Sequence, residues 1–329
     1  MKELTTLNDI AKRAGVAKST VSRYLNNGSV SDKTREKIQA IIEETGYVPN
    51  QFAQSLKAQH SNMIGVVLPR FDSPSTNQVL KGIDDVAHEK GYQLMLTNSN
   101  LSIEREKENI SLLKRQKVGG IILIASKMDE DLKKQVTQLS IPTLILGQKI
   151  EGVPSLVHQD YEAGRLIAEH ALELGHTKIL YVGVTEEDNA VGVLRRNGFM
   201  DTVKEAGFEA AFHETSFSRK EAYQQALDYL PTTEATYIAA ATDHIAIGIL
   251  NAANELNLSV PDDFSLSGFG GYSESDYTFP SITTIDYPFY DLGIKALNRI
   301  EQMMKEDPVS LLETLPNQLN VKQSTKKIK

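Results

Sequence analysis

Hydrophobic residues in the first 50 positions recur at the spacing of short amphipathic helices. One helical face carries Leu7, Ile10, Ala11 and Ala14. Thr6 can cap this helix at its N-terminus, and Gly15 can end it. A second helix over residues 18–26 must begin after a very short turn, and Ser31 can cap a third helix that Gly46 stops. The short glycine-containing turn predicts a helix-turn-helix within a small all-α unit.

From residue 63 onward, short apolar runs alternate with amphipathic helical patterns. The runs predicted to be strands are 64–68, 93–97, 120–125, 143–146, 179–182, 237–241 and 265–269. The helical patterns between them include 77–90, 103–117, 161–174 and 245–256. This alternation is typical of parallel sheets covered by helices on both faces. So many strands favour two sheets over one, and residues 322–329 are expected to form a polar tail.

The composition is that of an ordinary folded protein. Of the 329 residues, 40% are hydrophobic and 24% are charged, and a chain of this length usually forms more than one core. Because the chain has no Cys, disulfides, thiolate zinc sites and cysteine nucleophiles are excluded. No window approaches the ~18 uninterrupted apolar residues of a transmembrane helix, so no membrane partner is expected. The start of the chain lacks the apolar stretch of a signal peptide, so we expect a cytoplasmic protein.

The charge is unevenly distributed along the chain. The net charge is -8, yet residues 1–60 contain nine Lys and Arg against six Asp and Glu. The remaining residues carry 26 Lys and Arg against 37 Asp and Glu. A small basic head followed by an acidic body is a hint that the head binds phosphates, although many solvated helices carry as much charge.

Motifs for nucleotide or hydrolytic chemistry are missing. The body has no G-x-G-x-x-G after its first strand, no P-loop, no G-x-S-x-G elbow and no H-E-x-x-H. GFGG, which begins at Gly268, is better interpreted as a tight loop than as a phosphate cradle, because no convincing helix start follows it. We therefore expect no catalytic residues, no cofactor and no metal.

Characteristic stretches are spread along nearly the whole chain. The head contains LNDIAKRAGVAKSTVSRYLNNGSVSDKTREKIQAIIEETGYVPNQFAQSLKA from Leu7, and the body contains IGVVLP at Ile64, LGHTKI at Leu174, ATDHIAIG at Ala241 and PSITTI at Pro280. Together they resemble the LacI/GalR family of bacterial transcriptional repressors. Within that family, NNGSVS and FGGY resemble the sucrose-repressor branch of low-GC Gram-positive bacteria. The body pattern alone also suits periplasmic sugar-binding proteins.

The resemblance implies three regions. Residues 1–48 would form a helix-turn-helix DNA-binding headpiece, and residues 49–60 a hinge helix and linker. Residues 61–329 would form an effector-binding and dimerisation domain, an α/β bilobed body like a periplasmic binding protein with two parallel sheets. The first lobe would comprise 61–157 plus 288–312, and the second lobe 158–287 plus 313–329.

DNA contacts are expected from two segments. A helix in the major groove presents its first turns to base edges, which places Lys18, Ser19 and Arg23 within reach, while Thr20 and Ser22 can donate to phosphates. The DNA-binding residues implied by the resemblance are Thr6, Lys18, Ser19, Thr20, Ser22, Arg23, Asn26, Asn50, Gln54 and Leu56. From spacing alone an ordinary helical hairpin stays open. Ala17 stands where a capping Ser is usual, which should cost about 1 kcal/mol of helix stability.

The hinge helix implies a symmetric partner. In the family it pairs with its symmetry mate in the minor groove, with Leu56 as an apolar wedge that kinks the centre of the operator. Leu56 could instead pack against the body. A symmetric hinge pair predicts a homodimer on a palindromic operator. After Thr314 the chain lacks a leucine heptad, so a dimer is favoured over a tetramer.

A cleft between two lobes suits a sugar, because charged planar groups bond adjacent hydroxyls and aromatic faces cover C–H surfaces. The family pattern R-x-x-G-F is matched by Arg195, Gly198 and Phe199. The resemblance implies effector contacts from Arg195, Thr242, Asp243, Gly270 and Phe289. Gly270 stands where many sugar-binding relatives carry Asp, and Thr242 where several carry Asn.

Each of these effector residues has a plainer interpretation. Arg195 could pair with an acid on its own helix, Asp243 could cap the helix that begins at His244, and Phe289 could belong to the core. Sequence spacing does not decide between these roles.

The sequence thus predicts a sugar-responsive repressor of a carbohydrate utilisation operon, released from its operator by an inducer. Sucrose or a phosphorylated derivative is the expected effector. Two alternatives stay open. One is a catabolite-control regulator with a corepressor and a phosphocarrier partner, and the other is an α/β enzyme with a DNA-binding head.

Overall fold

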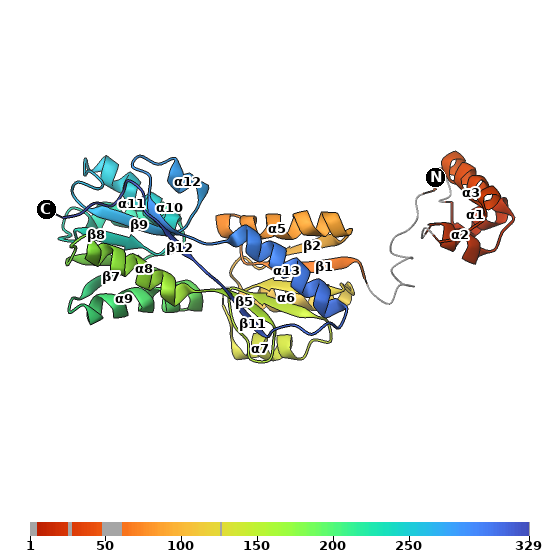
Figure 1. Ribbon diagram of the computed structural model, residues 1–329, viewed down its shortest axis with the longest axis horizontal. Coiled ribbons are helices and arrows are strands. Elements are labelled where there is room, and N and C mark those ends of the chain that lie inside the picture. The colour runs from red at the N-terminus through yellow and green to blue at the C-terminus, as the bar shows by residue number, and fades with distance from the viewer. Residues whose placement is uncertain (1–4, 26–27, 48–60, 126, 329) are drawn as a thin grey trace. The chain divides into compact units, whose positions relative to one another are not determined.

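The computed structural model describes residues 5–25, 28–47, 61–125 and 127–328. Contacts divide the chain into two compact units, Met1–Ser61 and Asn62–Lys329. The first, the headpiece, contains α1 (Leu7–Ala14), α2 (Lys18–Leu25) and α3 (Asp32–Thr45) (Figure 1). The second, the body, contains two six-stranded sheets. The predicted fold class is therefore confirmed, while the predicted hinge segment 49–60 lies outside the described residues.

Capping residues fix the start and end of the first headpiece helix. Thr6 Oγ1 accepts from the Asp9 N–H at 3.4 Å, and the Asp9 carboxylate accepts from the Thr6 N–H at 2.9 Å. Gly15 ends the helix at φ 64°, a conformation that glycine adopts without strain. Ser31 precedes α3 as expected, but its hydroxyl bonds the Thr34 hydroxyl instead of a helix N–H. The three helices enclose a core in which Ile10, Val21 and Ile38 are fully buried.

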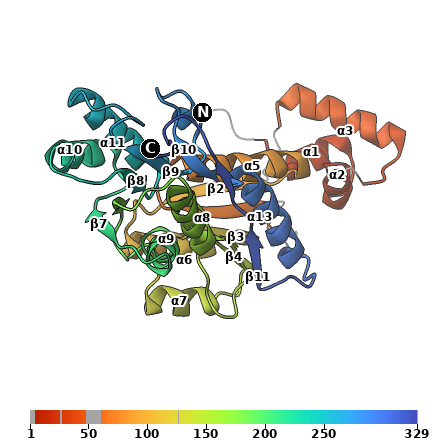
Figure 2. The same ribbon diagram turned by 60° about the vertical axis from the view of Figure 1, so that its left-hand side comes forward.

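The first lobe of the body is a parallel sheet in the order β11-β5-β4-β3-β1-β2. Its strands are β1 (Met63–Leu68), β2 (Gln93–Asn98), β3 (Gly120–Ile124), β4 (Thr143–Leu146), β5 (Ser155–His158) and β11 (Leu312–Leu315). Its helices are α5 (Pro74–Lys90), α6 (Ile103–Arg115), α7 (Glu130–Thr137) and α13 (Phe289–Met304). One apolar cluster joins α5 and α13 to one face of the sheet, and a second joins α6 and α7 to the other (Figure 2).

The second lobe is a sheet in the order β12-β10-β9-β8-β6-β7, parallel except for β12. Its strands are β6 (Ile179–Gly183), β7 (Ala210–Glu214), β8 (Tyr237–Ala240), β9 (Ser265–Gly270), β10 (Thr283–Asp286) and β12 (Gln318–Asn320). Its helices are α8 (Asp160–Glu173), the π-helical η1 (Asn189–Arg195), α9 (Arg196–Glu205), α10 (Arg219–Tyr229), α11 (Asp243–Glu255) and α12 (Ser273–Asp276). Helices α8 and α9 pack together, as do α10 and α11, on opposite sides of the sheet (Figure 1).

The chain passes between the lobes three times, after β5, between β10 and α13, and between β11 and β12. The first two passages lie within a residue or two of the positions expected from the sequence. The expected third boundary, between residues 312 and 313, is wrong because it falls inside β11, whose residues Leu312–Leu315 pair with β5. Alternating half-exposed side chains gave this short edge strand no clear apolar run.

The segment 322–328 is not the polar tail that its composition predicts. Ser324 is fully buried, and its hydroxyl accepts from the Thr283 N–H at 2.8 Å. The Ile328 N–H donates to the Leu174 carbonyl at 2.9 Å. The segment therefore belongs to the second lobe, where its polar side chains bond backbone groups that would otherwise be buried without partners.

Candidate functional site

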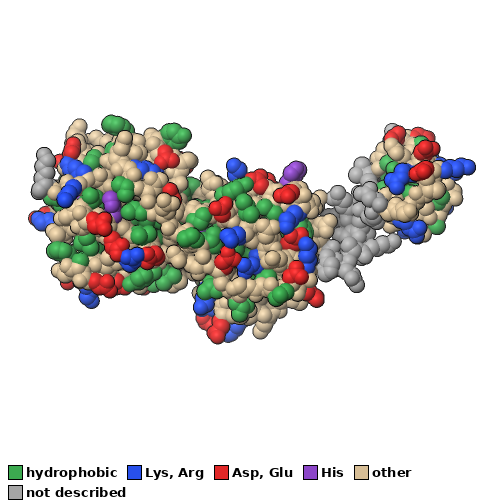
Figure 3. All heavy atoms as spheres, in the orientation of Figure 1, with side chains coloured by type: hydrophobic (Ala, Val, Ile, Leu, Met, Phe, Trp, Pro, Cys, Tyr) green, Lys and Arg blue, Asp and Glu red, His purple; other side chains and the backbone are tan. Residues whose placement is uncertain are grey.

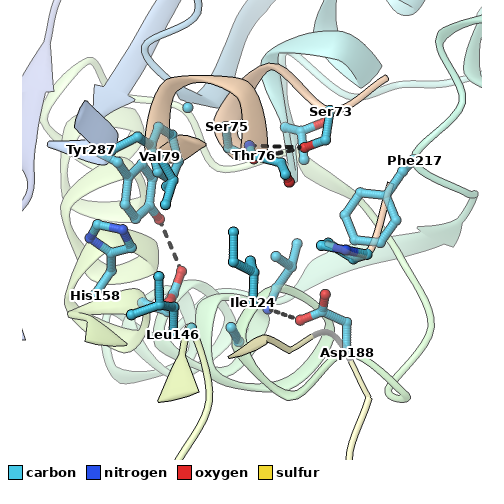
Figure 4. Close-up of a pocket in the computed structure, with 18 of the residues that line it drawn as sticks. Ser73, Ser75, Thr76, Val79, Ile124, Leu146, His158, Asp188, Phe217 and Tyr287 are labelled. Atoms are coloured by element: carbon cyan, nitrogen blue, oxygen red, sulfur yellow. Dashed lines mark hydrogen bonds between the residues drawn. The ribbon is translucent and has the colours of Figure 1, made fainter. Parts of the chain in front are cut away.

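A cavity lies between the two lobes, at the carboxyl ends of their parallel strands (Figure 4). This is where ligands bind in open α/β sheets. From the first lobe it is lined by Arg70, Ser73, Ser75, Thr76 and Ile124, among others. From the second lobe and the passages between the lobes it is lined by His158, Asp160, Asp188, Arg195, Phe217 and Tyr287, among others.

Arg195 forms the centre of a buried polar network. It is 6% exposed and donates from Nη2 and Nε to Asp160 Oδ1 at 2.6 and 3.2 Å, and from Nη1 to the Ala241 carbonyl at 2.6 Å. The Tyr287 hydroxyl donates to the same Asp160 oxygen at 3.1 Å. The guanidinium carbon lies 5.0 Å from the ring centroid of Phe269 and 4.9 Å from that of Tyr287. These contacts use three of the five guanidinium N–H donors, so two remain for a ligand in the cavity.

The other residues of R-x-x-G-F explain why Arg195 reaches this position. A Cβ atom at Gly198 would lie 1.9 Å from the Tyr161 carbonyl oxygen, and one at Gly164 would lie 2.0 Å from the Arg195 carbonyl oxygen. Only glycines allow α8 and α9 to approach so closely. Phe199 is fully buried and anchors α9 to the core. Arg195 thus pairs with Asp160 on α8, and not with an acid on its own helix, which was the plainer alternative.

Of Thr242 and Asp243, both expected to contact the effector, only Thr242 lines the cavity, and it also takes the capping role considered for Asp243. Thr242 caps α11 by accepting from the Ile245 N–H at 3.2 Å, and it lines the cavity. Asp243 is fully buried behind the cavity wall and is not the cap. Its carboxylate accepts from the Thr284 hydroxyl at 2.6 Å and from the Tyr272 N–H at 2.8 Å. Burial raises the pKa of Asp243 to about 6 despite these bonds.

Gly270 and Phe289 both lie at the cavity wall. Phe289 is the first residue of α13, stacks on Tyr287 with centroids 5.4 Å apart and meets the His158 ring edge-on at 5.2 Å. It also packs against the cores of both lobes, so the two roles weighed for it are compatible. Gly270 has φ 140°, and the ring of Tyr272 lies against it, where a Cβ atom would be.

Several cavity residues were not anticipated from the sequence, among them His158, Asp160 and Asp188. Burial lowers the pKa of His158 to about 4, so this imidazole is neutral at pH 7, and neither ring nitrogen has a partner among the described residues. Asp188 caps η1 by accepting from the Val191 N–H at 3.0 Å, and burial raises its pKa. His158 is the last residue of β5, Asp160 follows that strand by two residues and Asp188 follows β6 by five, so a place near a strand end is the signal that could have identified them.

The predicted recognition helix α2 carries Lys18 and Arg23 and no acidic residue. Lys18, Ser19 and Arg23 are exposed, whereas Thr20 and Ser22 are half-buried. The carbonyl of Ala17 accepts from the Thr20 N–H at 2.9 Å, but its methyl group offers no cap to the first turn. The acids of the described headpiece lie on α1 and α3, and Figure 3 shows both signs of charge on its visible face. Thr6 is exposed before α1, and Asn26, Asn50, Gln54 and Leu56 lie outside the described residues.

Metal and membrane features are lacking in the part of the chain that is described. Its His, Asp and Glu side chains form no group of three that could hold a metal ion. None of its helices combines the length and apolar character needed to cross a bilayer.

Comparison with known proteins connects the headpiece and the body. Residues 6–50 match the bacterial regulatory proteins of the lacI family, and residues 168–325 match the periplasmic binding protein-like domain. The chain is 38% identical over 309 residues to the sucrose operon repressor of Staphylococcus xylosus, covering 93% of this chain and 96% of that one. The chain belongs to the LacI family. This membership decides against the alternative of an enzyme with a DNA-binding head.

Other members of the LacI family match over the whole length. The ribose operon repressor of Halalkalibacterium halodurans is 32% identical, with 98% of each chain covered. The structure of the lac repressor dimer bound to operator and the anti-inducer ONPF superposes with a TM-score of 0.90 at 28% identity, covering 98% of this chain and 100% of that one. The predicted resemblance to the LacI/GalR family and its sucrose branch is confirmed.

Proposed function

We propose that this protein is a homodimeric repressor of a sucrose utilisation operon that leaves a palindromic operator when a sugar fills the cavity of the body. The observation that carries the proposal is the buried pair of Arg195 and Asp160, which holds two free guanidinium N–H groups at a cavity wall. The similarity to the sucrose operon repressor of Staphylococcus xylosus supports sucrose as the sugar.

The headpiece supports operator binding. Its helix α2 exposes Lys18, Ser19 and Arg23 and carries no acid, so nothing on this helix repels phosphate oxygens. Bidentate contact of an arginine with guanine discriminates by roughly 1 to 3 kcal/mol against other bases. We assign base reading to Lys18, Ser19 and Arg23, and phosphate contacts to Thr20 and Ser22.

The cavity supports a sugar ligand. Phe217, Tyr287 and Phe289 supply aromatic faces, and Arg195 and the neutral His158 supply hydrogen-bonding groups for hydroxyls. Asp160 neutralises Arg195, so this wall suits an uncharged ligand. A phosphorylated sugar would need another cation. Arg70 lines the cavity near the first turn of α5, but it is paired with Asp72 at 3.6 Å, so a phosphate would compete with that carboxylate.

Contacts between the lobes of the body can respond to a ligand in the cavity. Lys127, which follows β3 in the first lobe, pairs with Glu187 of the second lobe, and the Arg70 guanidinium lies 5.2 Å from the Phe217 ring centroid. A ligand that touches both lobes stabilises one relative arrangement of the lobes over another. A hundredfold change in operator affinity requires about 2.7 kcal/mol of such coupling.

The test is an operator titration with and without sugar. An operator is selected from a random DNA library with the full-length dimer, and its affinity is measured by fluorescence anisotropy with sucrose or sucrose 6-phosphate added. We expect one of them to weaken operator binding at least tenfold. A sugar that tightens binding would identify a corepressor and contradict release by inducer. Arg23→Ala should lose more affinity for the operator than for random DNA, and equal losses would refute base reading by Arg23.

A further inference from the structure

The turn at the end of β9 contains two glycines and places an aromatic ring against the first of them. Gly270 and Gly271 have φ of 140° and 63°, a region that favours glycine. A Cβ atom at Gly270 would lie only 2.6 to 2.9 Å from carbon atoms of the Tyr272 ring. The ring therefore covers the face of Gly270, and an acidic side chain at position 270 would collide with it.

Contacts from three sides fix Tyr272 in this place. Its N–H donates to Asp243 Oδ2 at 2.8 Å. Its ring meets the His244 ring edge-on, with centroids 5.3 Å apart, and lies 6.4 Å from that of Phe289. Burial raises the pKa of the Tyr272 phenol, and a hydrogen bond with the Ser75 side chain on α5 opposes the shift. That last bond joins the second lobe to the first.

Tyr272 stands between two cavities. The cavity that contains Arg195 is adjoined by a second one, whose further wall is formed by Gln78, Ser273, Glu274 and Asp291. Both are lined by Gly270, Tyr272, Tyr287 and Phe289. The second cavity is rich in polar groups that could bond sugar hydroxyls.

We propose that Tyr272 is a specificity-determining residue. Its ring forms the wall between the Arg195 cavity and the polar cavity beside it, and this wall limits the length of the sugar that can bind. The inference rests on the proposed function and deepens it. A disaccharide fills the first cavity, and a third sugar unit has no room unless the ring is removed. Because hydroxyls bind the polar groups beyond the wall, a longer saccharide gains contacts once the two cavities merge.

The test compares sucrose with two trisaccharides that extend it from opposite ends, raffinose and 1-kestose, by calorimetry on the full-length protein. We expect the wild type to bind sucrose at least a hundredfold more tightly than either trisaccharide. Tyr272→Ala should bind one of the trisaccharides at least tenfold more tightly than the wild type does, and sucrose more weakly. Tyr272→Phe keeps the ring and should keep the exclusion. Tyr272→Leu, a milder truncation, should give an intermediate gain.

Tyr161→Ala is the matched control, because Tyr161 is 43% exposed on α8 and bonds Asp201 within the second lobe. It should leave every affinity ratio unchanged. If sucrose binds the wild type but truncation of Tyr272 leaves the ratio of trisaccharide to sucrose affinity unchanged, the wall is refuted while the proposed function stands. If none of these sugars binds any variant, sucrose as the ligand fails and the inference fails with it.

Discussion

At the scale of single residues, Arg195 paired with Asp160 should affect both the response to sugar and the stability of the body, and the two effects can be measured separately. Arg195→Ala removes the guanidinium that lines the cavity, so the variant should bind operator normally and ignore the sugar. It also leaves the Asp160 carboxylate buried without its cation, which should destabilise the body by roughly 3 kcal/mol. Operator titration with and without sugar, together with urea unfolding, measures the two effects.

The neighbouring arginine is the control for that variant. Arg196 pairs with the exposed Glu186, so Arg196→Ala should leave the sugar response intact. An Arg195→Ala protein that is folded but fails to hold the operator would contradict the assigned role. Arg195 would then stabilise the DNA-binding arrangement itself.

Glu106 gives the first lobe a pH-dependent stability. The side chain is 1% exposed, and burial, with the nearby Asp129 carboxylate adding to it, raises the pKa of Glu106 to about 8. Folding therefore favours the protonated acid, so the stabilisation is complete below the ordinary pKa near 4.5 and is lost as the pH rises through 8. Glu106→Gln should remove this dependence and make the protein a few kcal/mol more stable than the wild type at pH 8.5.

Urea unfolding at pH 5.5 and pH 8.5 checks the Glu106 prediction. Glu104→Gln, a change at an exposed acid of the same helix, should leave the difference between the two pH values as it is in the wild type. Equal pH dependence in Glu106→Gln and in the wild type would show that this carboxyl is already ionised at neutral pH.

Sequence patterns pointed to several residues that lie at or near the cavity, but not to the contacts that each of them makes. R-x-x-G-F singled out Arg195, which lines the cavity, because the motif combines a charge, a close helix crossing and a core anchor in one turn. The cap of α11 is Thr242 and not Asp243, because capping depends on the backbone angles of the residue before the helix, and sequence does not resolve these for two adjacent polar residues. Asp160 and Tyr272 were missed because their partners, Arg195 and Ser75, lie far away along the chain.

At the scale of elements, glycine pairs set the crossing of helices in each lobe. Gly198 faces α8 in the second lobe, and Gly82 faces α13 in the first, where a Cβ atom would lie 2.1 Å from the Tyr290 carbonyl oxygen. Gly198→Ala should separate α9 from α8, destabilise the protein by roughly 2 kcal/mol and weaken sugar binding at least tenfold, because Arg195 moves with α9.

Gly82→Ala is the comparison for Gly198→Ala. It should cost a similar amount of stability without moving Arg195. Because the clash with Tyr290 displaces the start of α13, where Phe289 lines the cavity, its sugar affinity should fall, but by less than that of Gly198→Ala. Thermal unfolding and calorimetry with sucrose measure both quantities. Equal losses of sugar affinity in the two variants would show that overall loosening of the body, and not the position of Arg195, is responsible.

Sequence patterns predicted the central elements better than those at the edges. Central strands such as β1 and β8 are buried on both faces and form continuous apolar runs. Strands β7, β11 and β12 lie at sheet edges, where exposed positions interrupt the pattern. The segment 322–328 looked like a tail because its hydrogen bonds are made to distant strands, which no local pattern reveals. Ser324 Oγ accepts from the Thr283 N–H, and the Lys326 N–H donates to Ser265 Oγ.

At the scale of the whole molecule, the charge is divided between a basic head and an acidic body. Neutralised phosphates release counterions, so operator affinity should fall with salt by about 0.9 logarithmic units per logarithmic unit of salt for each phosphate contacted. We expect a slope of several units for a dimer. Lys149→Ala, which removes an exposed cation of the body, should leave the slope unchanged. A slope near zero would mean that phosphate contacts contribute little to binding.

Because the chain passes between the lobes three times, neither lobe can be completed early during translation. The first lobe starts at β1 but needs α13 and β11, and the second lobe needs β12 and the segment 322–328. Neither lobe has all its strands until residue 315 has been translated, whereas the headpiece has every helix of its described core by residue 45. A nascent chain can therefore hold a complete headpiece while each sheet of the body still lacks one edge strand. Nascent chains stalled near residue 300 should for that reason recruit chaperones through the uncovered edge of β5.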